Sequence, residues 1–253
     1  MSNLASVTDC DQCLRDVDTR DGDHLVVADL FRAPVSDGHP LELTEHLMSK
    51  ILLVLSSPRG EASHSSRVAR ELVRSLTTND PAADVVVRDL AASPQPHLDG
   101  AFLAALHTDA ASRTPEQAEA VAKADGLVAE LLAADSIVIA SAMINFGPAS
   151  TLKSWFDNLL RAGVTFRYDE SGPHGLVTGK KVYLVAANGG VYSEGPAKPF
   201  DFQVPYLKHL LGFMGMTDVE VITIEGVALG PDVAEKAVQA ALERASSVVA
   251  MAA

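Results

Sequence analysis

Five short apolar runs alternate along the chain with segments of helical pattern, and this alternation limits the possible folds more than any other feature. The apolar runs are strand-sized and cover residues 50–57, 84–90, 135–142, 180–187 and 218–225. The helical segments that follow them cover residues 64–76, 114–133, 148–161, 201–214 and 231–250. Neighbouring parallel strands must be joined by crossover connections, which are usually helices and are right-handed. The order therefore predicts an α/β fold, a doubly wound, five-stranded parallel sheet with helices on both faces.

The first fifth of the chain differs from the rest in composition. Residues 1–49 hold ten acidic and three basic side chains, so they carry more than half of the net charge of −13. The only two cysteines, Cys10 and Cys13, also lie there. These cysteines form a C-x-x-C pair, which can supply two zinc ligands. Because zinc normally takes four ligands and the sequence has no second C-x-x-C pair, we predict no metal site. We expect an acidic, poorly ordered N-terminal extension over 1–48 and one folded domain over 49–253.

Charge and hydropathy argue against two classes of partner. A net charge of −13 disfavours non-specific nucleic-acid binding, which needs a basic surface that displaces counterions. The longest apolar runs are too short to span a membrane, and the first residues lack the basic start and long apolar centre of a secretory signal. We therefore expect a cytoplasmic protein without a membrane partner.

The loop after the first apolar run has the composition of a phosphate site. Its serines precede a predicted helix, where hydroxyls, free backbone N–H groups and the helix dipole can hold one terminal phosphate. The glycine-rich fingerprints of ATP and dinucleotide sites are absent from the sequence. Serines also cap helices, and His64 can either add a donor or simply be exposed. The candidate residues are Ser57, Ser63, His64 and Ser65.

The loop after the third run suits a flat heterocycle. Asn145 offers an amide for a polar edge, Phe146 offers a ring face, and Gly147 lets the backbone turn closely. The proline that follows, Pro148, is suited to the start of a helix. An ordinary strand-to-helix connection is the alternative interpretation. The candidate binding residues are Ala142, Met143, Ile144, Asn145 and Phe146.

The loop after the fourth run offers a glycine pair whose backbone N–H groups are open to a ligand, flanked by polar side chains. Its candidate residues are Asn188, Gly189, Gly190 and Tyr192. In a doubly wound fold, ligands bind in the crevice outside the carboxyl ends of the strands, where all three loops meet. A phosphate cradle, a planar slot and an amide-rich loop together describe a mononucleotide with a large flat ring, and FMN fits best.

Longer segments of the chain resemble a known family. They are Ala-Met-Ile-Asn-Phe at 142–146, residues 152–157, 161–168 and 172–181, the pair Gly189 and Gly190, Gly-Phe-Met-Gly at 212–215, and Glu225-Gly226. These look like the FMN-dependent NADH azoreductase and NAD(P)H:quinone oxidoreductase family, over residues 50 to about 250. The resemblance implies a flavodoxin-like fold, a homodimer with one non-covalent FMN per subunit, and reduction of quinones or azo compounds by NADH or NADPH.

The resemblance also implies roles for individual residues. Ser57, Ser63 and Ser65 would hold the phosphate. Residues 143–146 would line the flavin, and the glycine pair would approach its pyrimidine. On the substrate side the family places residues from the partner subunit, which here are Tyr168 and Phe213. Trp155 is expected in the core or at an interface.

Four positions around the flavin depart from the usual family pattern. They are Ala142, where Pro is common; Ile144, where Tyr is common; Asn188, where Arg or another polar residue is common; and Tyr192, where His is common. These changes concern substrate range and redox tuning more than flavin binding.

The expected chemistry needs no catalytic side chain and no metal, because a flavin carries both electrons and the protein supplies orientation and electrostatics. Its kinetics should be ping-pong, with hydride transfer first from the nicotinamide and then to the acceptor. Two alternatives share the fold, a flavodoxin-type electron carrier and an FMN-binding redox sensor without rapid NAD(P)H turnover. A hydrolase is disfavoured, since the ligand edge shows no convincing Ser-His-Asp order.

Overall fold

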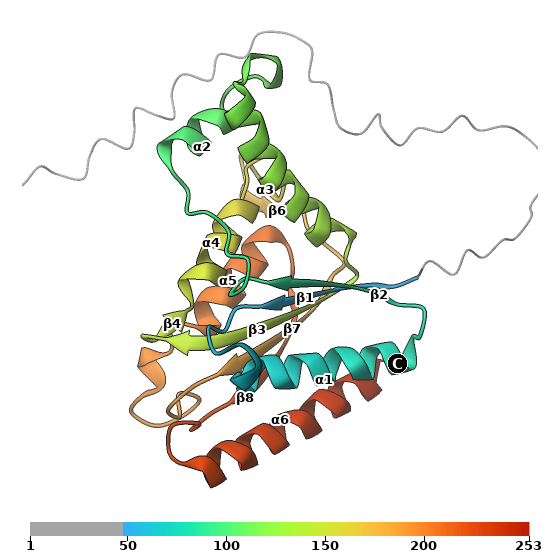
Figure 1. Cartoon of the computed structure of the whole chain (residues 1–253), viewed down its shortest axis with the longest axis vertical. Coiled ribbons are helices and arrows are strands. Elements are labelled where there is room, and N and C mark those ends of the chain that lie inside the picture. The colour runs from blue at the N-terminus through green and yellow to red at the C-terminus, as the bar shows by residue number, and fades with distance from the viewer. Residues whose placement is uncertain (1–47, 253) are drawn as a thin grey trace, which may run out of the picture. The chain divides into compact units, whose positions relative to one another are not determined.

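The computed structural model describes residues 48–252, and the predicted extension therefore lies outside the described residues (Figure 1). Five parallel strands form the main sheet in the order β2-β1-β3-β7-β8. Their bounds are β1 Lys50–Leu55, β2 Asp84–Asp89, β3 Ser136–Ile144, β7 Lys181–Ala187 and β8 Asp218–Ile224. The predicted doubly wound, five-stranded parallel sheet is confirmed, and the fold is flavodoxin-like.

Helices cover both faces of the sheet, as Figure 1 shows. Side chains of α1 and α6 pack on one face, and those of α3, α4 and α5 pack on the other. The bounds are α1 His64–Asn79, α2 Gly100–Leu106, α3 Pro115–Ala133, α4 Ser150–Leu159, α5 Val204–Met214 and α6 Pro231–Ala252. None of the described helices is long and apolar enough to cross a membrane.

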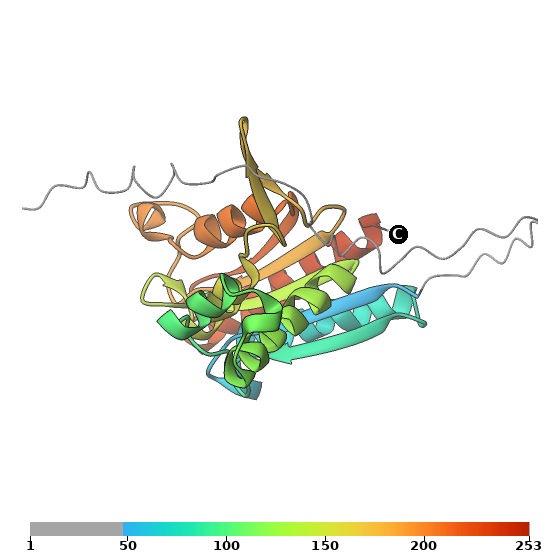
Figure 2. The ribbon, with the colours of Figure 1, turned by 90° about the horizontal axis from the view of Figure 1, so that it is seen from above.

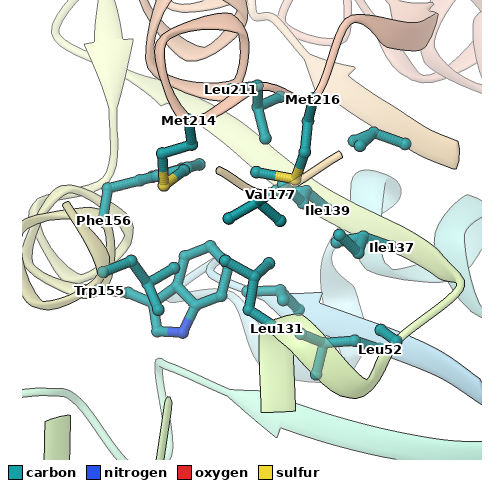
Figure 3. Packing of buried hydrophobic residues seen from close by; sticks show 14 of the residues in the cluster. Leu52, Leu131, Ile137, Ile139, Trp155, Phe156, Val177, Leu211, Met214 and Met216 are labelled. Atoms are coloured by element: carbon teal, nitrogen blue, oxygen red, sulfur yellow. The ribbon is translucent and has the colours of Figure 1, made fainter. Parts of the chain in front are cut away.

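The core is divided between these two faces because successive strand residues point to opposite sides. Ile137 and Ile139 of β3 meet the helices of one face, whereas Val138 and Ala140 meet those of the other. Figure 3 shows the first cluster, in which Trp155 lies among aliphatic and methionine side chains. Trp155 was expected in the core or at an interface. Only 1% of it is exposed, so it lies in the core.

Local sequence signals explain where several helices begin. Thr114 caps α3 with a reciprocal capping box, in which its hydroxyl accepts from the N–H of Gln117 and the Gln117 side chain accepts from the N–H of Thr114. Asp201 accepts from the backbone N–H groups of Gln203 and Val204. The carboxylate of Asp201 thus holds a turn, and α5 begins at Val204 rather than at residue 201.

The predicted helix over 148–161 begins later than expected, because Pro148 belongs to a hairpin. Strand β4, Gly147–Pro148, pairs antiparallel with Met143 and Ile144 of β3, and α4 starts only at Ser150. The assignment of Pro148 to a helix start is therefore wrong. A two-residue turn at Asn145 and Phe146 reverses the chain, with φ of 48° and 72°. Positive φ at both central positions is what such short hairpins require.

A second hairpin was not predicted. Strands β5, Phe166–Asp169, and β6, Gly172–Gly175, form a separate two-stranded sheet that projects from the body in Figure 2. Its tip is closed by Asp169, which accepts from the hydroxyl and N–H of Ser171 at 2.6 and 2.9 Å. These hydrogen bonds, with those from Arg167 and His174, hold the pKa of Asp169 well below its usual range.

Candidate functional site

A pocket of about 300 Å³ opens at the carboxyl ends of the parallel strands. It is formed by the loops after β1, β7 and β8 together with the end of β3. Its lining residues are Ser57, Pro58, Arg59, Ser63, His64, Ala142, Met143, Ile144, Ala187, Gly189, Val227 and Ala228. The volume lies at the lower end of the range for small-molecule sites. Its position is the one expected for a ligand in an open α/β sheet.

One end of this pocket carries hydroxyl groups beside a helix N-terminus. Ser63 is the N-cap of α1, and its hydroxyl accepts from the N–H of Ser66 at 3.2 Å and lies 3.1 Å from the hydroxyl of Ser65. Ser57 is buried and does not cap a helix. Its hydroxyl accepts a long hydrogen bond, 3.4 Å, from the N–H of Arg59. Free N–H groups in the first turn of α1 and the helix dipole make this end suited to an anion.

The wall formed by the end of β3 is apolar and leads into a strained turn. Phe146 has φ of 72°, which is unusual for a bulky residue. Its side chain is half exposed, and its ring meets that of Tyr192 edge-on at a centroid distance of 6.5 Å. Strain of this kind persists where the surrounding structure holds it and is concentrated at functional sites.

The loop after β7 is held by the neighbouring loop after β8. The N–H groups of Gly226 and Ala228 donate to the carbonyls of Gly190 and Gly189, at 2.9 and 3.0 Å. The carboxylate of Glu225 accepts from the N–H groups of Tyr192 and Ser193 and from the Ser193 hydroxyl, at 2.5–2.9 Å. The glycine pair is therefore fixed before any ligand arrives.

Asn188 occupies an unusual place in this loop. It is 1% exposed, and its Oδ1 atom has no hydrogen-bond partner in the structure. A buried amide oxygen without a partner costs free energy, so this atom has an acceptor left for a bound water or a ligand donor.

The structure brings together seven of the thirteen residues predicted to bind the cofactor. Those that line the pocket are Ser57, Ser63, His64, Ala142, Met143, Ile144 and Gly189. The other six border it through their neighbours and are Ser65, Asn145, Phe146, Asn188, Gly190 and Tyr192. Their roles toward a cofactor remain predictions.

The two residues predicted for the substrate side lie elsewhere on this chain. Tyr168 and Phe213 join Phe166 in an aromatic cluster, with Phe213 4.7 Å from the Phe166 ring and 6.4 Å from the Tyr168 ring. Tyr168 is 65% exposed and stands on the projecting β5–β6 hairpin. Neither residue lines the pocket described above.

Sequence reasoning missed several lining residues. Val227 and Ala228 follow β8, whose carboxyl end meets the same crevice, so their place next to the β7 loop could have been inferred from the strand order. Arg59 lines the anion end, although as a loop residue it carried no signal beyond its charge. Among residues 48–252, no group of three His, Cys, Asp or Glu side chains could hold a metal ion.

The donor set of this pocket fits a flavin mononucleotide. The serine hydroxyls offer hydrogen-bond donors for a phosphate, and Arg59 and the N-terminus of α1 offer positive charge. Aliphatic side chains from three segments form a slot for a flat ring. They are Ala142, Met143, Ile144, Ala187, Val227 and Ala228. The backbone of Gly189, held by the loop after β8, lines the same pocket beside this slot.

Comparison with known proteins agrees with this geometry. Residues 49–249 match the family described as having a flavodoxin-like fold. An FMN-dependent NADH:quinone oxidoreductase of Agrobacterium fabrum is 57% identical over 194 residues, which are 77% of this chain and 95% of that protein. FMN-dependent NADH:quinone oxidoreductase 1 of Rhizobium etli is 56% identical over 201 residues, 79% of this chain and 98% of that protein.

A solved structure supports the same relationship. The crystal structure of an azoreductase from Bacillus anthracis superposes with a TM-score of 0.74 at 35% identity, covering 80% of this chain and 99% of that one. The resemblance inferred from the sequence is thereby confirmed, and the chain belongs to the flavodoxin-like family of FMN-dependent NADH:quinone oxidoreductases and azoreductases.

Proposed function

We propose that the protein is an oxidoreductase that uses FMN to transfer hydride from NADH or NADPH to quinones and azo compounds. The observation that carries the proposal is the pocket at the carboxyl ends of the strands, which joins an anion-binding end to a flat apolar slot. Relatives more than 50% identical over nearly their whole length are named for this activity. FMN held in the pocket supplies the hydride chemistry, since it accepts two electrons from a nicotinamide and delivers them to an acceptor.

The anion end would orient the cofactor. The hydroxyls of Ser57 and of Ser65 would donate to the phosphate, while Ser63 caps α1 and lines the same end of the pocket. Arg59 and His64 line this end and add positive charge or donors. Because these groups lie on two adjoining elements, the loop after β1 and the first turn of α1, they would hold the phosphate without any rearrangement of the sheet.

The remaining residues would hold the ring and restrict water. Met143, Ile144 and the backbone of Gly189, which line the pocket, would contact the ring, and Asn145 in the adjoining turn would offer its amide to the polar edge. Asn188 offers its unpartnered Oδ1 to the same region. No proton-transfer side chain is required, since water supplies protons to the reduced acceptor.

A homodimer and a cytoplasmic location complete the proposal. Tyr168 and Phe213 are exposed or half-exposed aromatics that do not serve the pocket of their own subunit, and a partner subunit gives them a role on the substrate side of its pocket. The cytoplasm is the compartment in which NADH and NADPH are regenerated, which supports this location.

Anaerobic stopped-flow tests the proposal directly. The full chain is loaded with FMN, and flavin absorbance is followed after mixing with NADH or NADPH and then with p-benzoquinone. We expect fast bleaching by at least one nucleotide and fast return with the quinone, with parallel lines in steady-state double-reciprocal plots.

Each contrary outcome points to a different error. Tight FMN binding with slow bleaching by both nucleotides would replace the enzyme with an electron carrier or a redox sensor. A chain that does not bind FMN would overturn the assignment of the pocket itself.

A further inference from the structure

Three exposed aromatic side chains lie just outside the pocket. Phe146, Phe200 and Phe202 are 49%, 53% and 59% exposed, and we call them the aromatic rim. The rings of Phe146 and Phe200 are 6.2 Å apart, although the two residues come from different segments. Figure 1 shows both segments, the β3–β4 turn and the loop before α5, at the end of the sheet toward which the parallel strands point.

The rim is held in place by hydrogen bonds rather than left to move freely. The N–H of Phe202 donates to the carbonyl of Phe146 at 3.1 Å. The next residue, Gln203, is fully buried, and its Nε2 donates to the Ser141 hydroxyl at 2.8 Å. The carboxylate of Asp201 fixes the turn between them. The loop is thus tied at one point to the β3–β4 turn and at another to β3, the strand whose end lines the pocket.

The rim continues the wall of the pocket outward. Ile144 lines the pocket, and Phe146 follows it two residues later in the turn. On the other side, the Tyr192 ring meets Phe146 and packs beside Gly190, whose neighbour Gly189 lines the pocket. A molecule that protrudes from the pocket along this wall therefore meets aromatic faces.

Such a surface is costly to keep without a use. Phe146 adopts a backbone conformation that bulky residues avoid, and the rings of Phe146 and its neighbour Phe200, together with that of Phe202, remain exposed to water. Contiguous exposed apolar groups mark ligand or protein contacts. A pocket of about 300 Å³ filled by one mononucleotide leaves the acceptor at its mouth, where the rim begins.

We propose that the aromatic rim determines acceptor specificity by stacking against the outer rings of fused-ring aromatic acceptors, so that these are preferred over single-ring ones. The proposal rests on the proposed function and names the acceptor class of the same site. A fused-ring quinone is long enough to contact both the cofactor and the rim, whereas a single-ring quinone contacts the cofactor alone. Pairs of aromatic rings add affinity beyond the area that they bury.

The test compares 1,4-naphthoquinone with p-benzoquinone as acceptors for the FMN-loaded full chain. The double variant Phe200→Ala, Phe202→Ala removes two exposed rings from a loop whose anchors, Gln203 and Asp201, stay intact. We expect kcat/KM for naphthoquinone to fall about 5- to 10-fold relative to that for benzoquinone. Because the ratio is compared between variant and parent, the intrinsic reactivities of the two quinones cancel.

Two further variants make the result specific. Phe200→Tyr, Phe202→Tyr keeps the rings and should restore the preference. Leu132→Ala removes a similarly exposed apolar side chain at the end of α3, just before β3 starts and hence at the opposite edge of the sheet, and should leave the ratio unchanged.

The outcomes separate this proposal from the proposed function. The rate of flavin reduction by NADH is measured on every variant, so a parent chain that NADH does not reduce contradicts the proposed function and not the rim. An equal loss for both quinones, or no loss, overturns the rim as a specificity device. Dissociation of a dimer in the double variant would make the rim an interface between two copies, which also overturns it.

Discussion

At the scale of single residues, the three predicted phosphate serines do different work. Ser63 has a structural duty because its hydroxyl accepts from the N–H of Ser66 at the start of α1. Ser57 carries no such duty, since its contact with the N–H of Arg59 is long, at 3.4 Å. Removing the Ser63 hydroxyl should therefore affect both helix capping and ligand binding, whereas removing the Ser57 hydroxyl should affect ligand binding alone.

Ser57→Ala should weaken the binding of FMN while leaving that of riboflavin nearly unchanged, because riboflavin lacks the phosphate. Loss of one hydrogen bond to a charged group corresponds to about 1.5–3 kcal/mol, or roughly 10- to 150-fold in Kd. Fluorescence titration with both flavins measures this. The matched variant Ser63→Ala should in addition lower the free energy of unfolding by about 1 kcal/mol, seen in urea denaturation. Equal losses for the two flavins after Ser57→Ala would place the phosphate elsewhere.

At the scale of elements, the β5–β6 hairpin depends on a close backbone contact. Gly175 ends β6 against the end of α5, and a Cβ atom built on it would lie 2.1 Å from the backbone nitrogen of Gly215. The N–H of Val177 donates to the carbonyl of Met214 beside this contact, at 2.8 Å. Backbone on both sides leaves no side chain that could move away.

Gly175→Ala should therefore destabilise the protein by about 1–3 kcal/mol, as overpacking of a tight contact does. Gly126→Ala is the matched control, because Gly126 lies exposed within α3 with open space around its Cα. Alanine there should stabilise the helix by about 0.5–1 kcal/mol. Urea unfolding of both variants measures the change in the free energy of unfolding, which should be a decrease for Gly175→Ala and an increase for Gly126→Ala. An unchanged stability for Gly175→Ala would mean that the hairpin and α5 separate readily.

The same hairpin shows where prediction from the sequence ends. The central strands β1, β3 and β7 could be predicted because helices cover both of their faces, which produces continuous apolar runs such as 50–55. Strand β6, by contrast, reads Gly-Pro-His-Gly and has no alternation, since its position is set by its packing against α5. Helix α2 was likewise missed, because its seven residues start from a single Asp99 cap and offer too short a pattern.

The candidate site was predictable to a similar extent. Loops that follow strands in a doubly wound sheet converge by topology, so the serines after β1 and the glycine pair after β7 were found from their positions alone. The hairpin at Asn145 and Phe146 was not, because Asn-Phe lacks the glycine that usually reveals such a turn. Val227 and Ala228 could have been placed at this crevice from the strand order, but no local pattern encodes their hydrogen bonds to the loop after β7.

At the scale of the whole molecule, the pocket and both buried clusters, as far as residues 48–252 form them, lie within the part of the chain that matches the family. All lining residues fall between Ser57 and Ala228, and the family match begins at residue 49. The relatives are covered over 95–98% of their own length by this part of the chain. The described residues thus form the pocket of the proposed site, and we expect residues 1–47 to add nothing that it requires.

Removal of residues 1–47 should therefore leave the Kd for FMN and the kcat with NADH within about twofold of the full chain, because the residues proposed to bind FMN lie on the sheet and its loops. The shortened and full chains are compared side by side by flavin titration, steady-state turnover and urea unfolding. If turnover is lost while the unfolding transition and FMN affinity persist, the acidic segment takes part in the reaction, through nucleotide binding or the supply of the acceptor. If FMN affinity itself is lost, the boundary of the functional domain lies before Met48, and the pocket described above is only part of the site.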